Sequence, residues 1–355
     1  MNPPPRLSRL WWFTGPVLSV LVGATLIIGT LRVPYVILSP GSARSVVPLV
    51  TVTQKPGGPE VTEDPSSEDL LYVTVSSTVK PSGFLALWGW FDDTSQVEPS
   101  KPFLGEQTNE ENRALNLALM TDSQDKAKVV ALERLGYEVE KTPIGAFLED
   151  VDPSFPAAAV LKPGMTVVAV DGKPISSRDA LIDAITAKAP GDTMDLSAIP
   201  LAGGEAVDLT AELGERPDQP GTAALGVSTV DRVRYGFPVD IRIDTGKVGG
   251  PSAGLAFTLA ILDRMTPGSL TGGDRMAVTG TIELDSSVGP VGGVDHKTEA
   301  AIRAGAEVFL VPHDEFAQAK VVARGRIEIE EVNSLDEALA ALEAHGGDPL
   351  PAEQN

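Results

Sequence analysis

The chain has 355 residues, of which 42% are hydrophobic and 22% are charged. This is the composition of a globular protein, and the length indicates two or three domains. The absence of cysteine excludes disulfide bonds and thiolate metal sites, and with three histidines we expect no metal and no cofactor. The net charge is −21 with no basic stripe beyond the N-terminus, which argues against a nucleic-acid partner.

The N-terminal residues have the composition of a membrane anchor. Residues 1–32 carry three arginines and no acid, so their charge is +3 and the rest of the chain carries −24. The 21 residues from Trp11 to Leu31 are uncharged. As a helix they would span roughly 30 Å, the thickness of a bilayer core. We therefore predict a cytoplasmic segment at residues 1–10, a transmembrane helix at 11–31 and an extracytoplasmic location for the remainder.

A cleaved signal peptide is the alternative interpretation of this segment. The apolar region of a signal peptide normally has about 7–15 residues, and the uncharged run here is longer. Gly41, Ser42 and Ala43 form a small-residue cleavage pattern, but they lie well beyond the apolar run. We expect the anchor to be retained.

The next block of the chain combines strand and helix signals. Asp69–Val79 is rich in β-branched residues and predicts a strand. A helix is predicted from Thr108 to Gly136, because Thr108 and Glu111 have capping-box spacing and glycine is a common helix end. We expect a break in this helix near Thr121–Ser123.

Residues 141–213 predict a compact block of strands and short helices. The patterns indicate a short helix at Pro156–Val160, a strand at Thr166–Val170 and a helix that begins near Ser177. The Asp171-Gly172 pair predicts a tight turn after the strand.

The segment PAAAVLKPGMTVVAVDGKPI in this block resembles PDZ domains. The resemblance implies that an extended peptide pairs with an exposed strand edge, and that a loop before a strand holds its terminal carboxylate with backbone N–H groups. We assign this loop to Pro143–Ala146, with Ile144, Gly145 and Ala146 binding peptide. The loop is not a close match to the Gly-Leu-Gly-Phe pattern of PDZ domains, and a small α/β module without a ligand stays an alternative.

Residues 221–345 form the third predicted block, followed by a tail at 346–355. Helices are expected at Ser252–Met265 and Asp295–Ala304 and from Ser334 onward, where Ser334 and Glu337 have capping-box spacing. Strands are expected at FPVDIRI, RMAVTGTIEL and Val308–Val311.

Ser252 follows two glycines and a proline and opens one of these helices. The glycines permit a close backbone approach, and the free N–H groups and positive end of the helix lie beside the hydroxyl. Such a place can stabilise an oxyanion, so we assign the oxyanion loop to Gly250, Pro251 and Ala253. On the local pattern alone, a plain N-cap serine is the simpler interpretation.

A serine nucleophile needs a base, and Lys297 is the candidate. It falls in the first turn of the helix expected at 295–304, where the helix dipole disfavours a cation. Its pKa must fall by about 3 units from 10.4 for it to act near neutrality, and burial together with the positive helix end can supply such a shift. A solvated surface lysine is the alternative.

Three segments resemble the proteolytic domain of the Lon protease family: GGPSAG, MAVTGTIELDSSVGPVGGVDHK and AAIRAGAEVFLVP. The resemblance implies that Ser252 is the nucleophile, that Lys297 is its general base and that Thr279 helps to orient the lysine. It also implies an α+β fold. The stretch LALMTDSQDKAKVVALERLG resembles the region just upstream in that fold, so we expect residues 44–137 and 221–345 to pack together around an inserted PDZ-like block.

The chain departs from Lon itself because it has no G-x-x-x-x-G-K-[ST] motif and hence no recognisable ATPase module. An anchor, a PDZ-like block and a Lon-like block together resemble the membrane-bound, PDZ-containing Lon-like proteases of bacteria. We therefore predict an ATP-independent serine endopeptidase that cleaves extracytoplasmic proteins or peptides. The alternative is a catalytically inert PDZ scaffold at the membrane. Whether the chain forms a homo-oligomer stays open.

Overall fold

The computed structural model describes residues 18–19, 22–23, 28–56, 58, 69–101, 108–201, 203–246 and 248–351. The predicted segment 1–10 and most of the predicted span at 11–31 lie outside these residues. Within the part of the chain that the structure describes, no helix is both long enough and apolar enough to cross a membrane.

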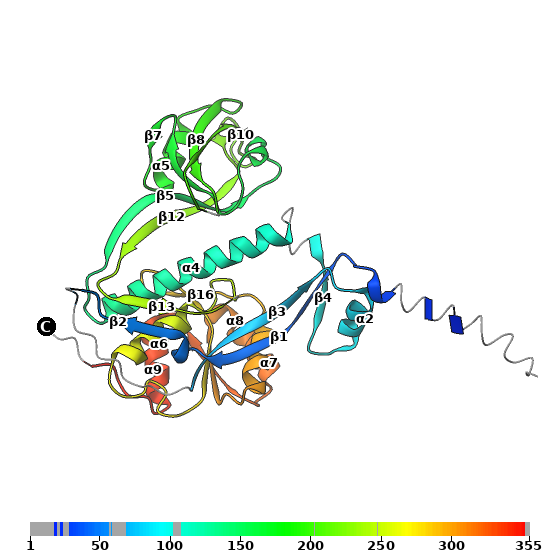
Figure 1. Cartoon of the computed structure of the whole chain (residues 1–355), viewed down its shortest axis with the longest axis vertical. Helices are drawn as coiled ribbons and strands as arrows, with labels where there is room; N and C mark the ends of the chain where they lie inside the picture. The colour runs from blue at the N-terminus through cyan, green and yellow to red at the C-terminus, as the bar shows by residue number, and fades with distance from the viewer. Residues whose placement is uncertain are drawn as a thin grey trace, which may run out of the picture.

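A mixed six-stranded sheet forms the centre of the main body (Figure 1). Its strand order is β18-β17-β14-β3-β1-β4. Strands β3, β14, β17 and β18 run parallel, and β1 is antiparallel to both of its neighbours. The strands are β1 (Tyr35–Ser45), β3 (Leu70–Val79), β4 (Gln96–Pro99), β14 (Met276–Val278), β17 (Val308–Pro312) and β18 (Glu328–Val332).

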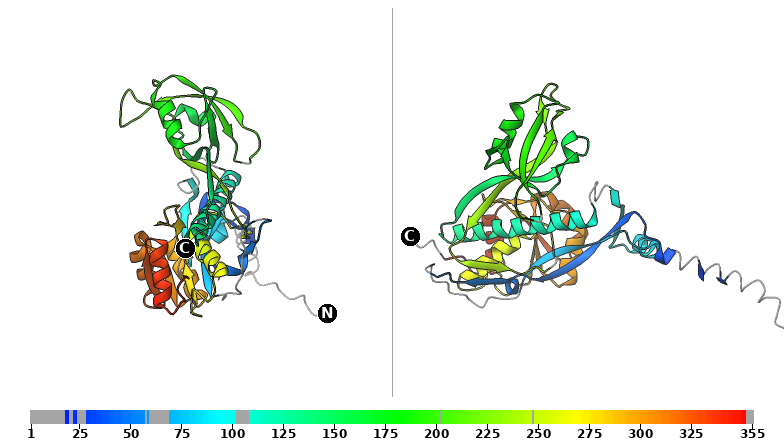
Figure 2. Two further views of the ribbon diagram at one scale, coloured as in Figure 1. Left: turned by 90° about the vertical axis from the view of Figure 1, so that its left-hand side faces the viewer. Right: turned by 45° about the horizontal axis from the view of Figure 1, so that its top comes forward.

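Side chains that alternate along these strands supply two hydrophobic cores, one on each face of the sheet. Leu70 and Tyr72 point into the core formed with α4, α6 and α9, whereas Leu71 and Val73 point into the core formed with α7 and α8. The main body therefore has three layers (Figure 2, left). The helices are α4 (Asn109–Arg134), α6 (Gly254–Met265), α7 (Val294–Arg303), α8 (His313–Ala323) and α9 (Leu335–Ala344).

The chain between α4 and β13 forms a separate inserted module, residues 140–236 (Figure 1). Its sheet has the order β12-β5-β6-β8-β9 and encloses its own core. The module is larger than the predicted block 141–213, because β12 pairs with β5 along its whole length. Its elements are β5 (Glu140–Val151), η2 (Pro156–Ala159), β6 (Thr166–Val170), β7 (Lys173–Pro174), α5 (Arg178–Thr186), β8 (Thr193–Ile199), β9 (Val207–Glu212), β10 (Gly214–Glu215), β11 (Ala223–Ala224) and β12 (Val227–Gly236).

The main body is built from segments on both sides of this module. Strand β3 and helix α4 precede it, β14 and α6 follow it, and these elements pair or pack with one another. The remaining elements are short: η1 (Val47–Leu49), β2 (Val50–Thr53), α2 (Gly83–Phe91), β13 (Asp240–Ile243), β15 (Thr281–Ile282) and β16 (Val288–Gly289). The expected α+β class is confirmed.

Helix α4 is continuous, so the expected break near Thr121–Ser123 is wrong. The Thr121 hydroxyl donates to the Leu117 carbonyl one turn earlier, and the Ser123 hydroxyl donates to a carbonyl outside the helix. Neither side chain competes with the helix for its own amides. The capping box formed by Thr108 and Glu111 is confirmed at the start of α4.

We expect the module to be dispensable for folding, whereas residues 44–137 are not. Thr142 and Arg234 face each other across β5 and β12, so an Asn-Gly turn between them can close the hairpin and remove the module. This module-free variant should unfold in one cooperative urea transition. A fragment of residues 221–345 lacks β3 and α4 and should show no such transition; cooperative unfolding of that fragment would refute the discontinuous core.

Candidate active site

A cavity of about 1110 Å³ opens in the main body between α4, β1, β3 and the loops that precede α6 and α7. Ser252 and Lys297 both line it, together with Ala253, Gly292 and Gly293. The fold therefore brings the predicted nucleophile and the predicted base to one cavity, although 45 residues separate them in sequence.

Ser252 lies in the turn before α6 and does not cap the helix. Ala253 is the N-cap residue, Gly254 is the first helical residue, and no side chain caps this helix. The expected helix start at Ser252 is thus wrong by two residues, and so is the interpretation of Ser252 as a plain N-cap. Its side chain borders the cavity instead.

Helix α4 holds the serine loop in place. The Gly250 N–H donates to the Asn116 carbonyl at 2.8 Å, and the Ser123 hydroxyl donates to the Pro251 carbonyl at 2.8 Å. A Cβ atom on Gly249 would lie 3.0 Å from Asn116 Cβ, and Gly250 has a φ of 93°. The glycines are therefore needed for close packing and for left-handed backbone. Sequence reasoning missed Asn116 and Ser123, which carry no motif.

The predicted oxyanion loop is only partly suited to its role. Pro251 has no N–H, and the N–H of Gly250 is already bonded to Asn116. Neither can therefore donate a hydrogen bond to an oxyanion. Within the described chain, the amides of Ser252 and Ala253 have no hydrogen-bond acceptor, so Ala253 stays the candidate donor and the Ser252 amide joins it.

Thr279 connects Lys297 to the serine loop. Lys297 Nζ donates to Thr279 Oγ1 at 3.1 Å, and Thr279 Oγ1 donates to the Ser252 carbonyl at 3.2 Å. The Gly280 N–H donates to the same carbonyl at 3.0 Å. The position of the lysine is thereby coupled to the backbone of the serine through one hydroxyl.

The start of α7 places Lys297 in the protein interior. Gly293 is the N-cap residue with a φ of 68°, and a Cβ atom there would lie 2.8 Å from Val75 Cγ2. Only glycine satisfies both conditions. Asp295, where the helix was expected to begin, lies in the first turn. Lys297 is the fourth helical residue, and 3% of its surface is exposed.

Burial lowers the pKa of Lys297 from its ordinary value of 10.5 to about 8, while the negative charge of Glu315 on α8 acts weakly in the opposite direction. Desolvation disfavours the charged form of an amine, which explains the sign. A lysine with this pKa can accept a proton near neutral pH. The neighbouring His296 is turned elsewhere, with Nδ1 3.1 Å from the Thr94 carbonyl oxygen.

The structure does not place Ile144, Gly145 and Ala146 in a loop. They lie in the middle of β5, where β12 pairs with one edge and β6 with the other. Ile144 occupies a β-bulge opposite β12. Because this stretch belongs to a central strand of the sheet and not to a loop, the predicted peptide-binding loop is wrong.

A groove elsewhere in the module has the geometry that the prediction sought. It encloses about 590 Å³ between α5 and the segment from Thr222 to Thr229. That segment leads into β12, an edge strand of its sheet. Its residues Ala224-Leu225-Gly226-Val227 share leucine and glycine with the Gly-Leu-Gly-Phe pattern, which is the signal that sequence reasoning overlooked.

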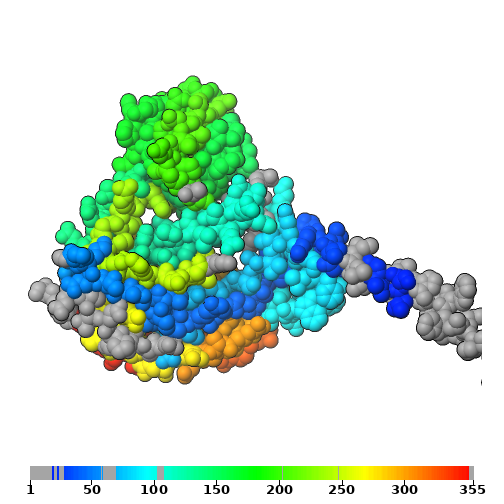
Figure 3. Space-filling model, viewed as in Figure 1, coloured from blue at the N-terminus to red at the C-terminus, as the bar shows by residue number. Residues whose placement is uncertain are grey.

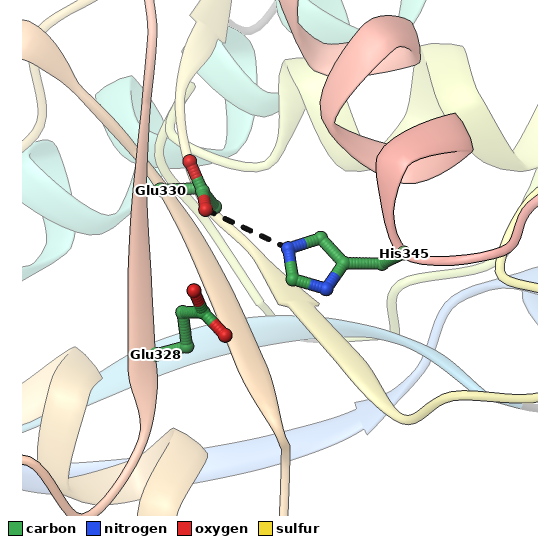
Figure 4. A group of neighbouring side chains, drawn as sticks. All are labelled: Glu328, Glu330 and His345. Atoms are coloured by element: carbon green, nitrogen blue, oxygen red, sulfur yellow. Dashed lines mark ion pairs between the residues drawn. The ribbon is translucent and has the colours of Figure 1, made fainter.

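A second group of polar side chains lies on the main body, at the ends of β18 and α9 (Figure 4). Glu328, Glu330 and His345 place one ligand atom each within 4.8 Å of the others. His345 Nε2 lies 3.6 Å from Glu330 Oε1. Surface acids commonly form such pairs, so we assign this group no chemical role.

Comparison with known proteins identifies the region that carries the site. Residues 184–344 match the family model of the Lon protease (S16) C-terminal proteolytic domain. The match begins inside α5 and includes Ser252, Thr279 and Lys297, whereas Asn116 and Ser123 of α4 precede it. The expected resemblance to this domain is confirmed.

Curated proteins similar to this chain include Lon proteases. Lon protease 1 of Sorangium cellulosum is 34% identical over 163 residues, which are 42% of this chain and 20% of that protein. The Lon protease of Syntrophus aciditrophicus is 33% identical over 132 residues, 34% of this chain and 16% of that protein. The matched part of the chain thus spans about a fifth or less of the length of these relatives.

Among solved structures, the PDZ domain of an SdrC-like protein from Listeria monocytogenes is 27% identical, with a TM-score of 0.23. The match covers 24% of this chain and 88% of that chain. The corresponding domain from Listeria innocua is 26% identical, with a TM-score of 0.22 and coverage of 24% and 92%.

We expect Lys297→Met to stabilise the protein. Methionine has a similar volume and no ammonium group to bury, and the fall of the lysine pKa from 10.5 to about 8 corresponds to a gain of at most about 3 kcal/mol at pH 7. Urea unfolding of both proteins measures the difference. Lys126→Met, at a more exposed lysine paired with Glu283, is the control and should not stabilise.

The gain in stability from Lys297→Met should decrease as pH rises. The folded-state pKa of Lys297 lies below its unfolded value, so below pH 8 both states hold the proton and the penalty is full. Between pH 8 and 10.5 only the unfolded state stays protonated, and the native protein becomes more stable as pH rises. The advantage of Lys297→Met should therefore shrink across this window, and a constant difference would contradict the assignment.

Proposed function

We propose that the protein is an ATP-independent serine endopeptidase with Ser252 as nucleophile and Lys297 as general base. The observation that carries this proposal is the buried Lys297, hydrogen-bonded through Thr279 to the Ser252 backbone and lining the same cavity. The proteolytic-domain match includes all three residues. An inert scaffold has no need of a lysine that is buried at such a cost in stability.

The reaction proceeds through an acyl-enzyme. Ser252 Oγ attacks the peptide carbonyl carbon and its proton passes to the neutral Nζ of Lys297. The amides of Ser252 and Ala253 donate to the developing oxyanion. Lys297 then gives the proton to the leaving amine as the C–N bond breaks. Water attacks the ester, Lys297 takes its proton, and the acid is released as Ser252 regains a hydrogen.

An extended substrate fits beside β3. Strand β14 pairs with β3 only along Leu70–Tyr72. Beyond Tyr72 the described strands leave the other edge of β3 unpaired, and Val73–Ser77 line the cavity. A peptide paired with this edge gains main-chain hydrogen bonds that do not depend on its sequence.

The inserted module serves substrate recognition in this proposal. The groove between α5 and the start of β12 has an edge strand on one side and an apolar helix face on the other. This is the arrangement by which a peptide adds a strand to a sheet. We therefore propose that peptide binds at Leu225–Val227 and not at Ile144–Ala146.

We further propose that the uncharged stretch 11–31 tethers the chain to the membrane with its bulk outside the cytoplasm. The support is the sequence: the stretch is long enough to span a bilayer core, and arginines precede it. Substrates are then extracytoplasmic proteins or peptides.

The catalytic assignment predicts that Ser252→Ala and Lys297→Ala each lower kcat for a fluorogenic peptide by at least about a thousandfold. Thr279→Val, which removes both hydrogen bonds of the hydroxyl, should lower it by roughly 10–100-fold, and Thr279→Ser should restore most of the loss. Cooperative unfolding of each variant controls for folding. Activity retained in Ser252→Ala or Lys297→Ala would leave the inert scaffold as the better description.

The pH dependence of the wild type checks the role of the lysine. Only neutral Lys297 accepts the serine proton, so kcat/KM should rise with pH and level off above about 8. Lys297→Arg should be inactive at every pH, since arginine stays charged.

The module-free variant separates recognition from chemistry. Because the catalytic residues lie in the main body, this variant should cleave a short peptide at near wild-type kcat/KM. It should cleave an unfolded protein such as casein at least about tenfold more slowly, if the groove binds one end of the substrate. A Gly226→Val substitution, whose Cβ atom would overlap the Phe155 ring and displace it at the groove, should reproduce the casein defect. Equal casein cleavage by all three proteins would exclude the module from recognition.

A further inference from the structure

In helix α2 the small residues are buried and the large apolar residues are exposed to solvent. Its buried residues are the small ones, Ala86 and Gly89. Its large apolar residues are exposed: Phe91 shows 79% of its surface, Trp88 67% and Phe84 56%, and the same holds for Leu85, Leu87 and Trp90. No residue of the helix is charged. A water-exposed helix normally has the opposite arrangement.

The small inner face is required by the fold. A Cβ atom on Gly89 would lie 2.9 Å from Val97 Cγ2 and 3.4 Å from Ile37 Cγ2, so the helix packs closely against β1 and β4. Ser82 caps its N-terminus by accepting from the Leu85 N–H. The Trp90 ring meets Tyr35 edge-on at 5.8 Å between centroids. The helix is therefore held in one orientation, with its aromatic side chains directed outward.

The first residue of helix α2 lies in space beside the last residue of the uncharged N-terminal stretch. The Gly83 N–H donates to the Leu31 carbonyl at 2.9 Å, and Arg32 and Ser82 form an isolated β-bridge. In Figure 1 the helix lies at the end of the main body where β1 begins, and Figure 3 shows this part of the surface projecting from the rest of the main body.

The tryptophans of the chain support the same placement. All four lie at two places: Trp11 and Trp12 before the uncharged stretch, and Trp88 and Trp90 on α2. Tryptophan is enriched at the two interfaces of a bilayer. In the proposed tether, a helical stretch of that length would be about 30 Å long, which would assign one tryptophan pair to each interface.

From these observations we propose that α2 is a lipid-binding element, whose face of Phe84, Leu87, Trp88 and Phe91 inserts into the headgroup region of the outer leaflet. This inference rests on the membrane tether of the proposed function. The interaction is apolar, since the helix bears no charge and the extracytoplasmic part of the chain is strongly acidic. Zwitterionic lipid is therefore a sufficient partner.

The absence of cysteine makes single-site labelling a clean test. The full chain is reconstituted in phosphatidylcholine vesicles with a nitrobenzoxadiazole dye on Leu87→Cys. The matched control is Val321→Cys on α8, which is 73% exposed. Emission at position 87 should rise on reconstitution and should be quenched by phosphatidylcholine with a nitroxide near the headgroup. The dye at position 321 should show neither effect.

A second variant links the effect to the aromatic face. Phe84→Ser, Trp88→Ser and Phe91→Ser together leave Ala86, Gly89 and Trp90 in place. They should abolish lipid quenching at position 87 while peptidase activity on a soluble peptide stays unchanged. Unchanged activity also shows that the variant is folded.

Two results would overturn the proposal. One is a dye at position 87 that stays in water in vesicles. The other is a dye at position 87 whose emission rises in vesicles but is not quenched by the nitroxide lipid. If its emission in detergent also rises with protein concentration, a second copy of the chain covers the helix instead of lipid. Carbonate extraction of the vesicles reports the tether separately, and peptide cleavage reports the catalytic assignment, so failure of α2 to bind lipid is distinguishable from failure of either.

Discussion

The hydrogen bond from Lys297 to Thr279 is the interaction on which the site depends. A buried ammonium group is costly unless it is paired, and here its partner is a hydroxyl rather than a carboxylate. The hydroxyl keeps the lysine in place without supplying the negative charge that would hold it protonated. The same hydroxyl bonds the Ser252 carbonyl, so the proposed base and the proposed nucleophile share one support. Stability and reactivity are therefore opposed at this position, as is common in active sites.

The main body is formed from two separate parts of the chain, and the first part holds the serine loop in place. Helix α4 is separated from the serine loop by more than a hundred residues, yet Asn116 and Ser123 fix that loop. Glycines at 249 and 254 allow the close approach, and Gly250 supplies the left-handed backbone. The inserted module joins the main body through β5 and β12, which leave the main body side by side (Figure 2). Because the connection is a hairpin, insertion of the module leaves the core around the site intact.

Much of this organisation could be predicted from the sequence, and the exceptions have physical reasons. Ser252, Thr279 and Lys297 lie in segments that resemble the Lon proteolytic domain, and the structure brings them together. The start of α6 was misplaced because serine is a common N-cap, whereas Ala253 takes that position without a side-chain bond. The peptide loop was misplaced because Gly145 marks a strand residue beside a bulge rather than a turn. Asn116 and Ser123 act through long-range contacts that a helical pattern does not encode.

The length of chain between strand β3 and helix α2 also limits the distance between the cavity and that helix. Val75 of β3 lies against Gly293 at the rim of the active-site cavity, and eight residues of chain lead from it to Gly83, the first residue of α2. A chain of that length reaches at most about 29 Å. With α2 seated in the outer leaflet, the catalytic cavity cannot lie farther than this from the lipid. A substrate that is itself anchored in the membrane would then need about eight extended residues between the bilayer and the peptide bond that reaches Ser252. In the proposed membrane placement, the fold would thus favour substrate segments next to the membrane over distant loops, through geometry rather than through sequence.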